Sequence, residues 1–238
     1  MKLSVPCMRC HAESGGPIFE YYPLNYYNNT VINLTCSRGH ESVVVLQSQK
    51  FEILLESAAS ALIDGYTLES AATLSSAYER FFEFSINVFV EKNKIDAQEL
   101  AKTLKQATHQ SERQLGAFLY LYLITFKKHY KINENIAAFR NKIIHKGYIP
   151  TDSEVISFGE KIYEEIFKVS KLLQSQYPQE VHQVIVKSMH MSTMDIPPQM
   201  HRTTLLTSGI FSLSSDINKS NFQDAYAAYK GFKSRGAI

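Results

Sequence analysis

From Gln47 to Pro178, apolar residues recur every three or four positions, and this helical periodicity constrains the fold more than any other feature of the sequence. Residues 75–90 read SSAYERFFEFSINVFV, a run so rich in aromatic side chains that it predicts a helix with neighbours on several sides. A second long run covers 152–176. Long helices joined by short loops favour an antiparallel bundle of four or five helices. We therefore expect a mainly α protein in which residues 47–180 form the bundle.

The two ends of the chain differ in amino-acid composition from this middle part. Residues 1–46 are rich in Tyr, Asn, Gly and Pro and contain two alternating β-branched runs, TVINLTC and ESVVVLQ. These runs predict a small β-rich element. After Met189 the chain becomes rich in Met, Ser, Thr and Pro before a final amphipathic run, FQDAYAAYKGF. We expect residues 181–238 to form a C-terminal helix and a partly irregular tail that packs on the bundle or on a partner.

The N-terminal element carries a candidate zinc site. Cys7 and Cys10 are spaced Cys-x2-Cys, and Cys36 and His40 are spaced Cys-x3-His. Two such turns on a β-ribbon can bring four ligands into a tetrahedron, as in a zinc ribbon, although His11 is an alternative fourth ligand. Four protein ligands leave no open position for catalysis, so we expect one structural Zn²⁺ per chain and no catalytic metal. The alternative is three buried cysteines and an unrelated histidine.

Charge and hydropathy restrict the possible partners and compartment. Twenty-five Lys and Arg against 23 Asp and Glu give a net charge of +2, so any contact with nucleic acid must be local. This near-neutral charge argues against a zinc-ribbon regulator that binds duplex DNA. The sequence has no long apolar run and no apolar signal segment, so we expect a cytoplasmic protein with no membrane partner. The odd number of cysteines fits a reducing compartment.

A second group of candidate functional residues lies in the sequence RNKIIH, on a short predicted helix between Asn133 and Gly147. Asn141 and His145 are four positions apart and share a helix face, while Arg140 is long enough to curl back toward them. Cleavage of RNA without a metal needs a group that moves protons and a fixed positive charge on the phosphate. Histidine and arginine fill these roles. For His145 alone, a histidine stabilised by the helix dipole is the alternative.

The RNKIIH motif, its position before a long helix, and the earlier YERFFEF helix together resemble the HEPN superfamily. These all-helical nucleotide-binding domains are widespread in prokaryotic defence and toxin systems. The resemblance covers roughly residues 47–178 and rests on one short motif and on helix order. It implies a dimeric, metal-independent ribonuclease in which Arg140 and His145 match the catalytic pair and Asn141 matches the polar residue beside the arginine.

The same resemblance implies an acidic residue on the second helix of the bundle, for which Glu79 and Glu83 are the candidates. One sequence does not decide between them, and for Glu79 a solvated face or an ion pair within its helix is the alternative. Some members of the superfamily carry a tyrosine two residues after the histidine. This chain has Gly147 there and Tyr148 one residue later. The departure puts in doubt any regulation through modification of that tyrosine.

Two functions follow as hypotheses. The preferred one is an endoribonuclease that acts as a toxin or phage-defence effector, with RNA as substrate and an active site shared between two subunits of a homodimer. Cleavage would leave a 2′,3′-cyclic phosphate, and a triggering or inhibitory partner protein would restrain it. The alternative is a non-catalytic module that binds a nucleotide or partner at the same cleft while the zinc ribbon recognises nucleic acid.

Overall fold

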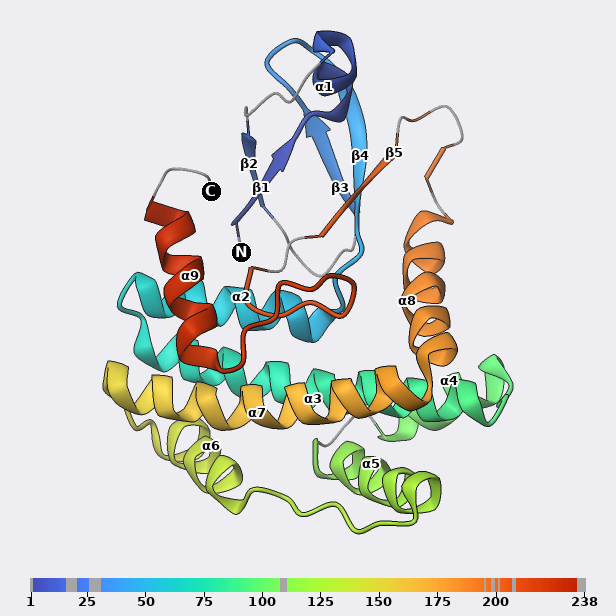
Figure 1. Cartoon of the computed structure of the whole chain (residues 1–238), viewed down its shortest axis with the longest axis vertical. Coiled ribbons are helices and arrows are strands. Elements are labelled where there is room, and N and C mark those ends of the chain that lie inside the picture. The colour runs from blue at the N-terminus through green and yellow to red at the C-terminus, as the bar shows by residue number, and fades with distance from the viewer. Residues whose placement is uncertain are drawn as a thin grey trace.

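The computed structural model describes residues 2–15, 21–25, 31–107, 111–194, 196–197, 200, 202–206 and 209–234. This described part is mainly helical and carries a small β part at one end (Figure 1). The expected fold class is confirmed in this coarse form. None of the described helices combines the length and the apolar character that crossing a membrane requires.

In chain order the described elements are β1 (Lys2–Pro6), α1 (Met8–Ser14), β2 (Tyr21–Asn25), β3 (Val31–Thr35), β4 (Glu41–Leu46), α2 (Lys50–Ile63), α3 (Thr67–Lys92), α4 (Ala97–Ala107), α5 (Ser111–Phe126), α6 (Glu134–Lys146), α7 (Asp152–Gln176), α8 (Pro178–Thr193), β5 (Arg202–Leu205) and α9 (Phe222–Ser234).

Helix α3 is the centre of the helical part, because it packs against α2, α5, α6, α7 and α8. Its aromatic side chains point to different neighbours. Phe81 meets Phe51 of α2 with ring centroids 5.2 Å apart, and Phe82 meets Phe118 of α5 at 4.7 Å. All four rings are buried. A helix that is apolar on several sides is stable only when it is enclosed, so the dense aromatic run dictates this central position.

Helices α2 and α3 form a hairpin, and the turn between them follows from its sequence. Asp64 ends α2, and Gly65 has a φ of 81°, in the left-handed region that glycine adopts without steric cost. The amide of Gly65 donates to the carbonyl oxygen of Leu62 at 3.1 Å. The chain therefore reverses at the Asp64–Gly65 pair and brings the two helices together.

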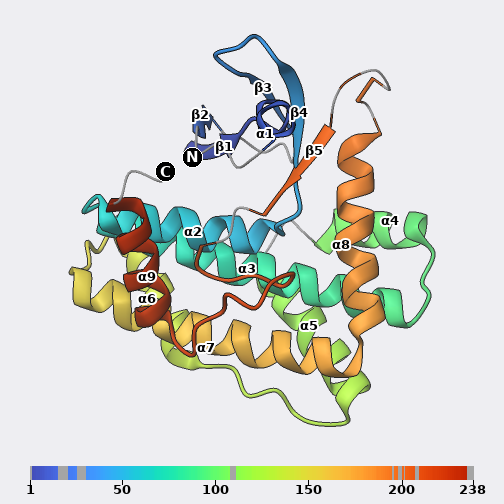
Figure 2. The same ribbon diagram turned by 45° about the horizontal axis from the view of Figure 1, so that its top comes forward.

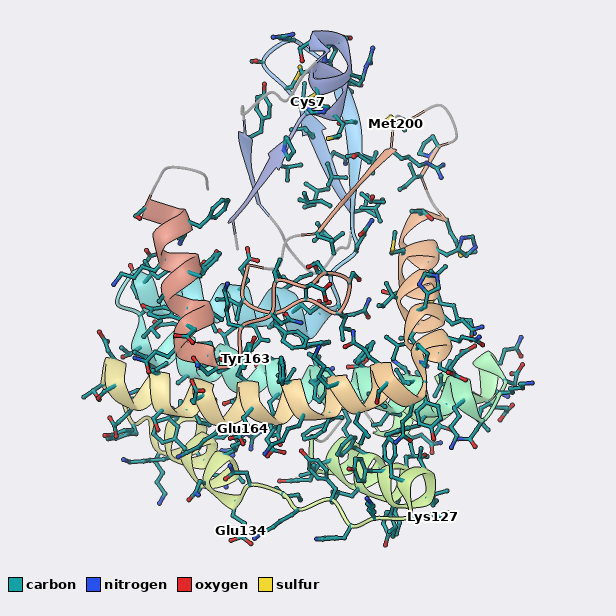
Figure 3. All side chains as sticks on the ribbon, viewed as in Figure 1. Cys7, Lys127, Glu134, Tyr163, Glu164 and Met200 are labelled. Carbon is teal, nitrogen blue, oxygen red and sulfur yellow. The ribbon has the colours of Figure 1, made fainter. Side chains whose placement is uncertain are left out.

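The β part contains two small sheets and a helix that the sequence reading missed. β1 and β2 are antiparallel, and β3 and β4 are antiparallel in the second sheet. Between β1 and β2 lies α1, a helix of seven residues that begins directly after Cys7. Figure 3 places Cys7 at the opposite end of the molecule from Glu134, the first residue of α6. The buried residues Leu34, Val44 and Ile53 belong to one cluster, so the β part packs on α2.

The described chain beyond residue 180 contains the rest of α8, one strand and a last helix. Pro178 occupies the first turn of α8, where a missing amide costs nothing, so it ends α7 and begins the next helix. Figures 1 and 2 both show α8 rising from the end of α7 toward the sheets. β5 then pairs in parallel with β4, with Val43 opposite Arg202, and so completes the N-terminal sheet. α9 packs back on α7, where the ring of Phe222 covers Gly159.

Two buried carboxyl groups of α2 hold the segment that leads into α9. Glu52 Oε1 accepts a hydrogen bond from the backbone amide of Leu213 at 2.8 Å. Glu56 Oε2 accepts from the amide of Gly209 at 2.9 Å, and the Tyr229 hydroxyl lies 3.4 Å from Glu56 Oε1. Burial raises the pKa of both carboxyl groups to about 7, although these hydrogen bonds favour the ionised form and oppose the rise.

These carboxyl groups predict a pH dependence of stability. Their folded pKa lies above the ordinary value of 4.5, so the folded state binds protons more tightly than the unfolded chain. Their contribution is complete below that ordinary value and is lost as the pH rises through about 7. Glu56→Gln keeps an oxygen acceptor for Gly209 and offers an amide hydrogen to Tyr229. We expect this variant to show a weaker fall in unfolding free energy between about pH 5 and about pH 8.

Urea unfolding at a series of pH values measures this dependence, with Glu69→Gln as the control because Glu69 is exposed on α3. An identical pH profile for the wild type and Glu56→Gln would contradict the assignment of the dependence to Glu56.

Candidate functional site

Helix α6 presents the RNKIIH residues because its two ends and its buried face are defined by the sequence. The Asn133 side chain accepts a hydrogen bond from the amide of Asn135 and caps the start of the helix. Gly147, with a φ of 62°, ends it in the left-handed conformation. Ile136 and Ile143 are the buried residues of the helix. The polar residues of the motif are therefore turned toward the surface.

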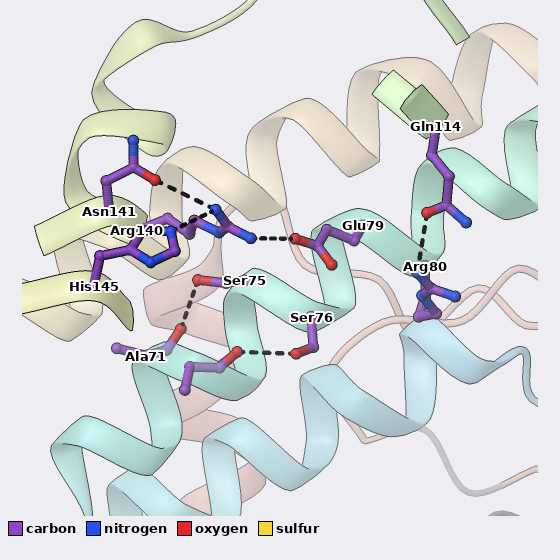
Figure 4. A network of polar contacts seen from close by, with 10 residues as sticks. Ala71, Ser75, Ser76, Glu79, Arg80, Gln114, Arg140, Asn141 and His145 are labelled. Atoms are coloured by element: carbon purple, nitrogen blue, oxygen red, sulfur yellow. Dashed lines mark hydrogen bonds and ion pairs between the residues drawn. The ribbon is translucent and has the colours of Figure 1, made fainter. Parts of the chain in front are cut away.

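The structure brings the four predicted site residues into one cluster, which Figure 4 shows. Arg140 Nη1 lies 3.3 Å from Asn141 Oδ1 and 3.4 Å from His145 Nε2. Arg140 Nη2 lies 3.2 Å from Oε1 of Glu79, which reaches over from α3. The guanidinium thus curls back along α6, as the spacing predicted, and connects the two helices.

The contacts distinguish between the two acidic candidates on α3. Glu83 forms an ion pair at 2.6 Å with Arg80, one turn earlier on its own helix. Arg80 also donates to Gln114 Oε1 of α5 at 3.0 Å. Glu79 and Arg80 are adjacent, yet the helical rotation of about 100° sends one side chain to α6 and the other to α5. Glu79 is therefore the acidic residue that contacts Arg140.

The cluster is open to solvent and suited to an anionic ligand. The side chains of Arg140 and Glu79 are 26% and 29% exposed, and Asn141 and His145 are exposed residues. A guanidinium can only donate hydrogen bonds, so its contact with His145 Nε2 is a hydrogen bond only when that nitrogen carries no proton. In the tautomer with the proton on Nδ1, Nε2 would be a proton acceptor beside a fixed positive charge. A general base and a phosphate-binding group need this pairing.

The side chain of Tyr148 contacts Glu154 and Lys142 and makes no described hydrogen bond to the Arg140 cluster. Its hydroxyl donates to the carboxylate of Glu154 at 2.9 Å and 3.0 Å, and Lys142 Nζ lies 3.3 Å from the centroid of its ring. The backbone amide of Thr151, followed by the Tyr148 hydroxyl, lowers the pKa of Glu154. These contacts connect the end of α6 to the first turn of α7.

The predicted metal ligands also converge, from four places in the β part. Cys7 directly precedes α1, and Cys10 lies in its first turn. Cys36 follows β3, and His40 precedes β4. The turn between them closes through Gly39, whose φ is 78° and whose amide donates to the Cys36 carbonyl at 2.9 Å. Short turns at the strand ends therefore aim the four side chains at one point.

The distances between the possible ligand atoms fit a tetrahedrally coordinated metal ion. The possible ligand atoms of Cys7, Cys10, Cys36 and His40 all lie within 4.8 Å of one another. Cys10 Sγ lies 3.7 Å from Cys36 Sγ and 3.3 Å from His40 Nδ1, and Cys7 Sγ lies 3.8 Å from that nitrogen. Tetrahedral zinc with ordinary bond lengths separates its sulfur and nitrogen ligands by roughly 3.5–3.8 Å. The cluster can therefore hold a zinc ion with little movement.

Neighbouring groups support this ligand set. Glu13 Oε1 lies 3.3 Å from His40 Nε2, so the carboxylate can orient the ring with Nδ1 toward the sulfur atoms. His11, the alternative fourth ligand, is not part of the cluster among the described residues. Burial raises the pKa of the Cys10 thiol to about 12, and the sulfur atoms of Cys36 and Cys7 add to the rise. Burial also acts to raise the pKa of the Cys36 thiol, but hydrogen bonds from the backbone of His40 and Arg38 and from the side chains of Cys10 and Cys7 together lower it.

No family model, no curated protein and no solved structure matches the chain. The chemistry of both sites is therefore inferred from their own geometry.

We predict that the cluster around Arg140 contributes little to the free energy of unfolding. A partly exposed ion pair such as Glu79–Arg140 is worth less than about 1 kcal/mol, whereas truncation of a buried ring such as Phe82→Ala costs about 3–5 kcal/mol. We expect Glu79→Gln to lower the unfolding free energy by less than about 1 kcal/mol in urea titrations. Glu83→Gln, which breaks the Arg80 pair on the same helix, is the matched control. A loss of several kcal/mol in Glu79→Gln alone would show that the cluster is a structural brace.

Proposed function

We propose that the protein is a metal-independent endoribonuclease of the HEPN type whose active site is the cluster of Arg140, Asn141, His145 and Glu79. The observation that carries the proposal is the contact of one guanidinium with the other three side chains on a solvent-accessible surface. A phosphate-binding group and a proton acceptor thus stand side by side. Action as a toxin or phage-defence effector is part of the proposal and rests on the resemblance alone.

The reaction follows from the chemistry of these groups. His145 Nε2 takes the proton of a ribose 2′-hydroxyl, and the 2′-oxygen then attacks the adjacent phosphorus. The bond from phosphorus to the 5′-oxygen breaks, and an acid returns a proton to that oxygen. The products are a 2′,3′-cyclic phosphate and a 5′-hydroxyl. General acid–base catalysis of this kind contributes roughly 10²–10⁴-fold to a rate.

Arg140 would supply the charge that the reaction needs. Its planar guanidinium can hold two oxygens of the scissile phosphate and stabilise the extra negative charge of the transition state. Glu79 keeps the guanidinium oriented before RNA binds, and Asn141 holds it from the α6 side. These contacts support a site that is organised before its substrate arrives.

One copy of the cluster offers one imidazole, whereas the reaction uses both a base and an acid. We propose that a second copy of the chain supplies the second imidazole, so that the active site lies between the subunits of a homodimer. Two exposed apolar residues that are close to His145 in the sequence, Ile144 and Ile149, support a contact surface at this end of α6, with 46% and 70% of their surface exposed. A partner protein that covers this surface would restrain the enzyme.

The proposal predicts RNA cleavage in EDTA that depends on the cluster. We expect Arg140→Ala and His145→Ala each to reduce the cleavage rate by at least roughly 100-fold, because each removes a different catalytic group. Gel assays of a labelled RNA measure the rate, and end analysis of the products detects the cyclic phosphate. His129→Ala is the matched control, since His129 is exposed between α5 and α6 and lies outside the cluster.

Each variant is first compared with the wild type in urea unfolding, so that a folding defect is recognised. Cleavage that survives both substitutions would refute the proposed site. Full activity in a protein that sedimentation velocity shows to be monomeric would refute the shared site while leaving the catalytic residues in place.

We further propose that Cys7, Cys10, Cys36 and His40 bind a structural zinc ion, with His40 held by Glu13. The support is the spacing of the four ligand atoms together with the carboxylate on the far side of the ring. The buried cluster of this part contains few residues, so metal binding would supply folding free energy that apolar burial does not.

The zinc proposal predicts one zinc ion per purified chain and the absorption spectrum of a tetrahedral thiolate site after cobalt exchange. We expect Cys36→Ser to lose most of the metal, and Glu13→Gln to weaken zinc binding by roughly 10–100-fold in chelator competition. His11→Ala should keep the metal. Zinc that is retained in Cys36→Ser, or lost in His11→Ala, would overturn the ligand set.

The alternative function is a non-catalytic module that binds a nucleotide or a partner phosphate at the same surface. The ion pair between Arg140 and Glu79 favours this alternative, because a guanidinium whose charge is already compensated by a carboxylate has less charge with which to stabilise a transition state. Intact RNA at high protein concentration, combined with nucleotide binding that Arg140→Ala abolishes, would select this function over the enzyme.

A further inference from the structure

A cavity beside α3 begins at Arg80, which points away from the side of the helix on which Glu79 meets Arg140, and it has no role in the proposed function. Its volume is about 650 Å³, and it is lined by residues of α2, α3, α4 and α8 together with the chain that enters α2. Ligand-binding cavities of proteins typically measure about 300–1,000 Å³. The space is therefore of the size that holds a small organic molecule.

Most of the cavity wall is apolar. Phe51 and Ile53 contribute from α2, Phe84 and Val90 from α3, and Val184 from α8. Phe51, Phe84 and Ile53 are buried in the wall itself. Apolar side chains that face water in a cavity are stabilised when an apolar ligand displaces that water, by about 25 cal/mol per Å² of apolar surface covered. A ligand with an apolar body would cover this wall.

Helix α4 forms one side of the cavity and is separate from the buried core. It contributes Leu100 and Ala101 to the lining, and none of its residues whose exposure is described is buried. Figures 1 and 2 show α4 beside the end of α3 and the side of α8. Ile95, just before α4, and Met191, on α8, also line the cavity and are 51% and 72% exposed. A helix in this position can close on a ligand.

The charged residues of the lining indicate the head group that a ligand would carry. Both acidic residues are already paired, Glu83 with Arg80 and Glu91 with Lys187, each at 2.6 Å. Lys50 adds one more positive charge, so the lining has three cationic and two anionic side chains. Lys50 is the first residue of α2, and the positive end of the helix dipole adds to its charge.

We propose that this cavity is a binding site for an organic anion with an apolar ring or chain, whose acidic group lies toward Lys50 and Arg80. The apolar body lies between α3, α8 and Leu100 of α4. The assignment does not depend on the ribonuclease proposal, because binding is measured without any reaction. The ligand would nevertheless contact α3 at Arg80, the residue next to Glu79.

The probe for the test is 8-anilino-1-naphthalenesulfonate, a fluorescent aromatic anion. The chain contains no tryptophan, so a single introduced tryptophan reports on α4 alone. Ala101→Trp fills the cavity from an exposed position of α4, whereas Thr103→Trp places the same side chain on the opposite face of the helix. The second variant is the matched control and also the energy-transfer donor for the bound probe.

We expect one saturable site per chain in the wild type and in Thr103→Trp, with energy transfer in the latter. Ala101→Trp should weaken probe binding by roughly tenfold or more, because the indole occupies the space of the ligand. Lys50→Gln should weaken it by a smaller factor than Ala101→Trp, whereas Lys131→Gln, outside the lining, should not. Equal binding by Ala101→Trp and Thr103→Trp would overturn the site.

Competition identifies the head group. Decanoate and decyl phosphate should displace the probe at lower concentrations than decanol or decylammonium, and the better of the two anions assigns the acid as a carboxylate or a phosphate ester. Displacement by decylammonium that equals or exceeds that by the anions would overturn the charge assignment. Probe binding that disappears as chains associate in sedimentation would show a second copy in the cavity and overturn the small-ligand proposal.

Discussion

The enclosure of α3 by apolar contacts is the interaction on which the rest of the structure depends. Its aromatic side chains pack in several directions, against Phe51 of α2 and Phe118 of α5 among others. Burial of rings of this size contributes several kcal/mol each, so the neighbouring helices are held in position by one shared core. The stretches of α3 that reach the surface then have fixed partners. The position of Glu79 against α6 is a consequence of this packing and not of the weak ion pair that it makes.

Two polar environments arise from adjacent residues of that same helix. Glu79 meets Arg140, and Arg80 meets Gln114 of α5 and the cavity beside α4. The rotation of about 100° per residue separates the two side chains, although their backbone atoms belong to one rigid element. A ligand at either place therefore contacts the helix that shapes the other. In the Arg140 cluster, the contribution of the core is to preorganise charged groups that would otherwise be mobile on a surface.

The small β part is held by contacts from distant segments. Its sheet is completed by β5, and its apolar cluster includes Ile53 of α2. The buried acids Glu52 and Glu56 hold the segment that follows β5 by accepting its backbone amides. A part with so little apolar area needs such contacts between distant segments, and at its far end Cys7, Cys10, Cys36 and His40 also converge from separate segments. Segments from both ends of the chain therefore stabilise this region. The buried acids Glu52 and Glu56 favour their protonated form below about pH 7.

Features that depend on neighbours along the chain could be predicted from the amino-acid sequence. The helical period located the long helices, Asn133 and Gly147 bounded α6, and the spacing of Arg140 and His145 placed their side chains within reach of each other. The two pairs of candidate metal ligands, Cys7 with Cys10 and Cys36 with His40, were likewise visible from their short spacings. Only the tertiary structure decided which acid of α3 meets Arg140, that His40 and not His11 joins the cysteines, and that β5 pairs with β4. Each of these is a contact between segments far apart in the chain, set by how the helices and strands pack, and no local pattern of residues encodes it.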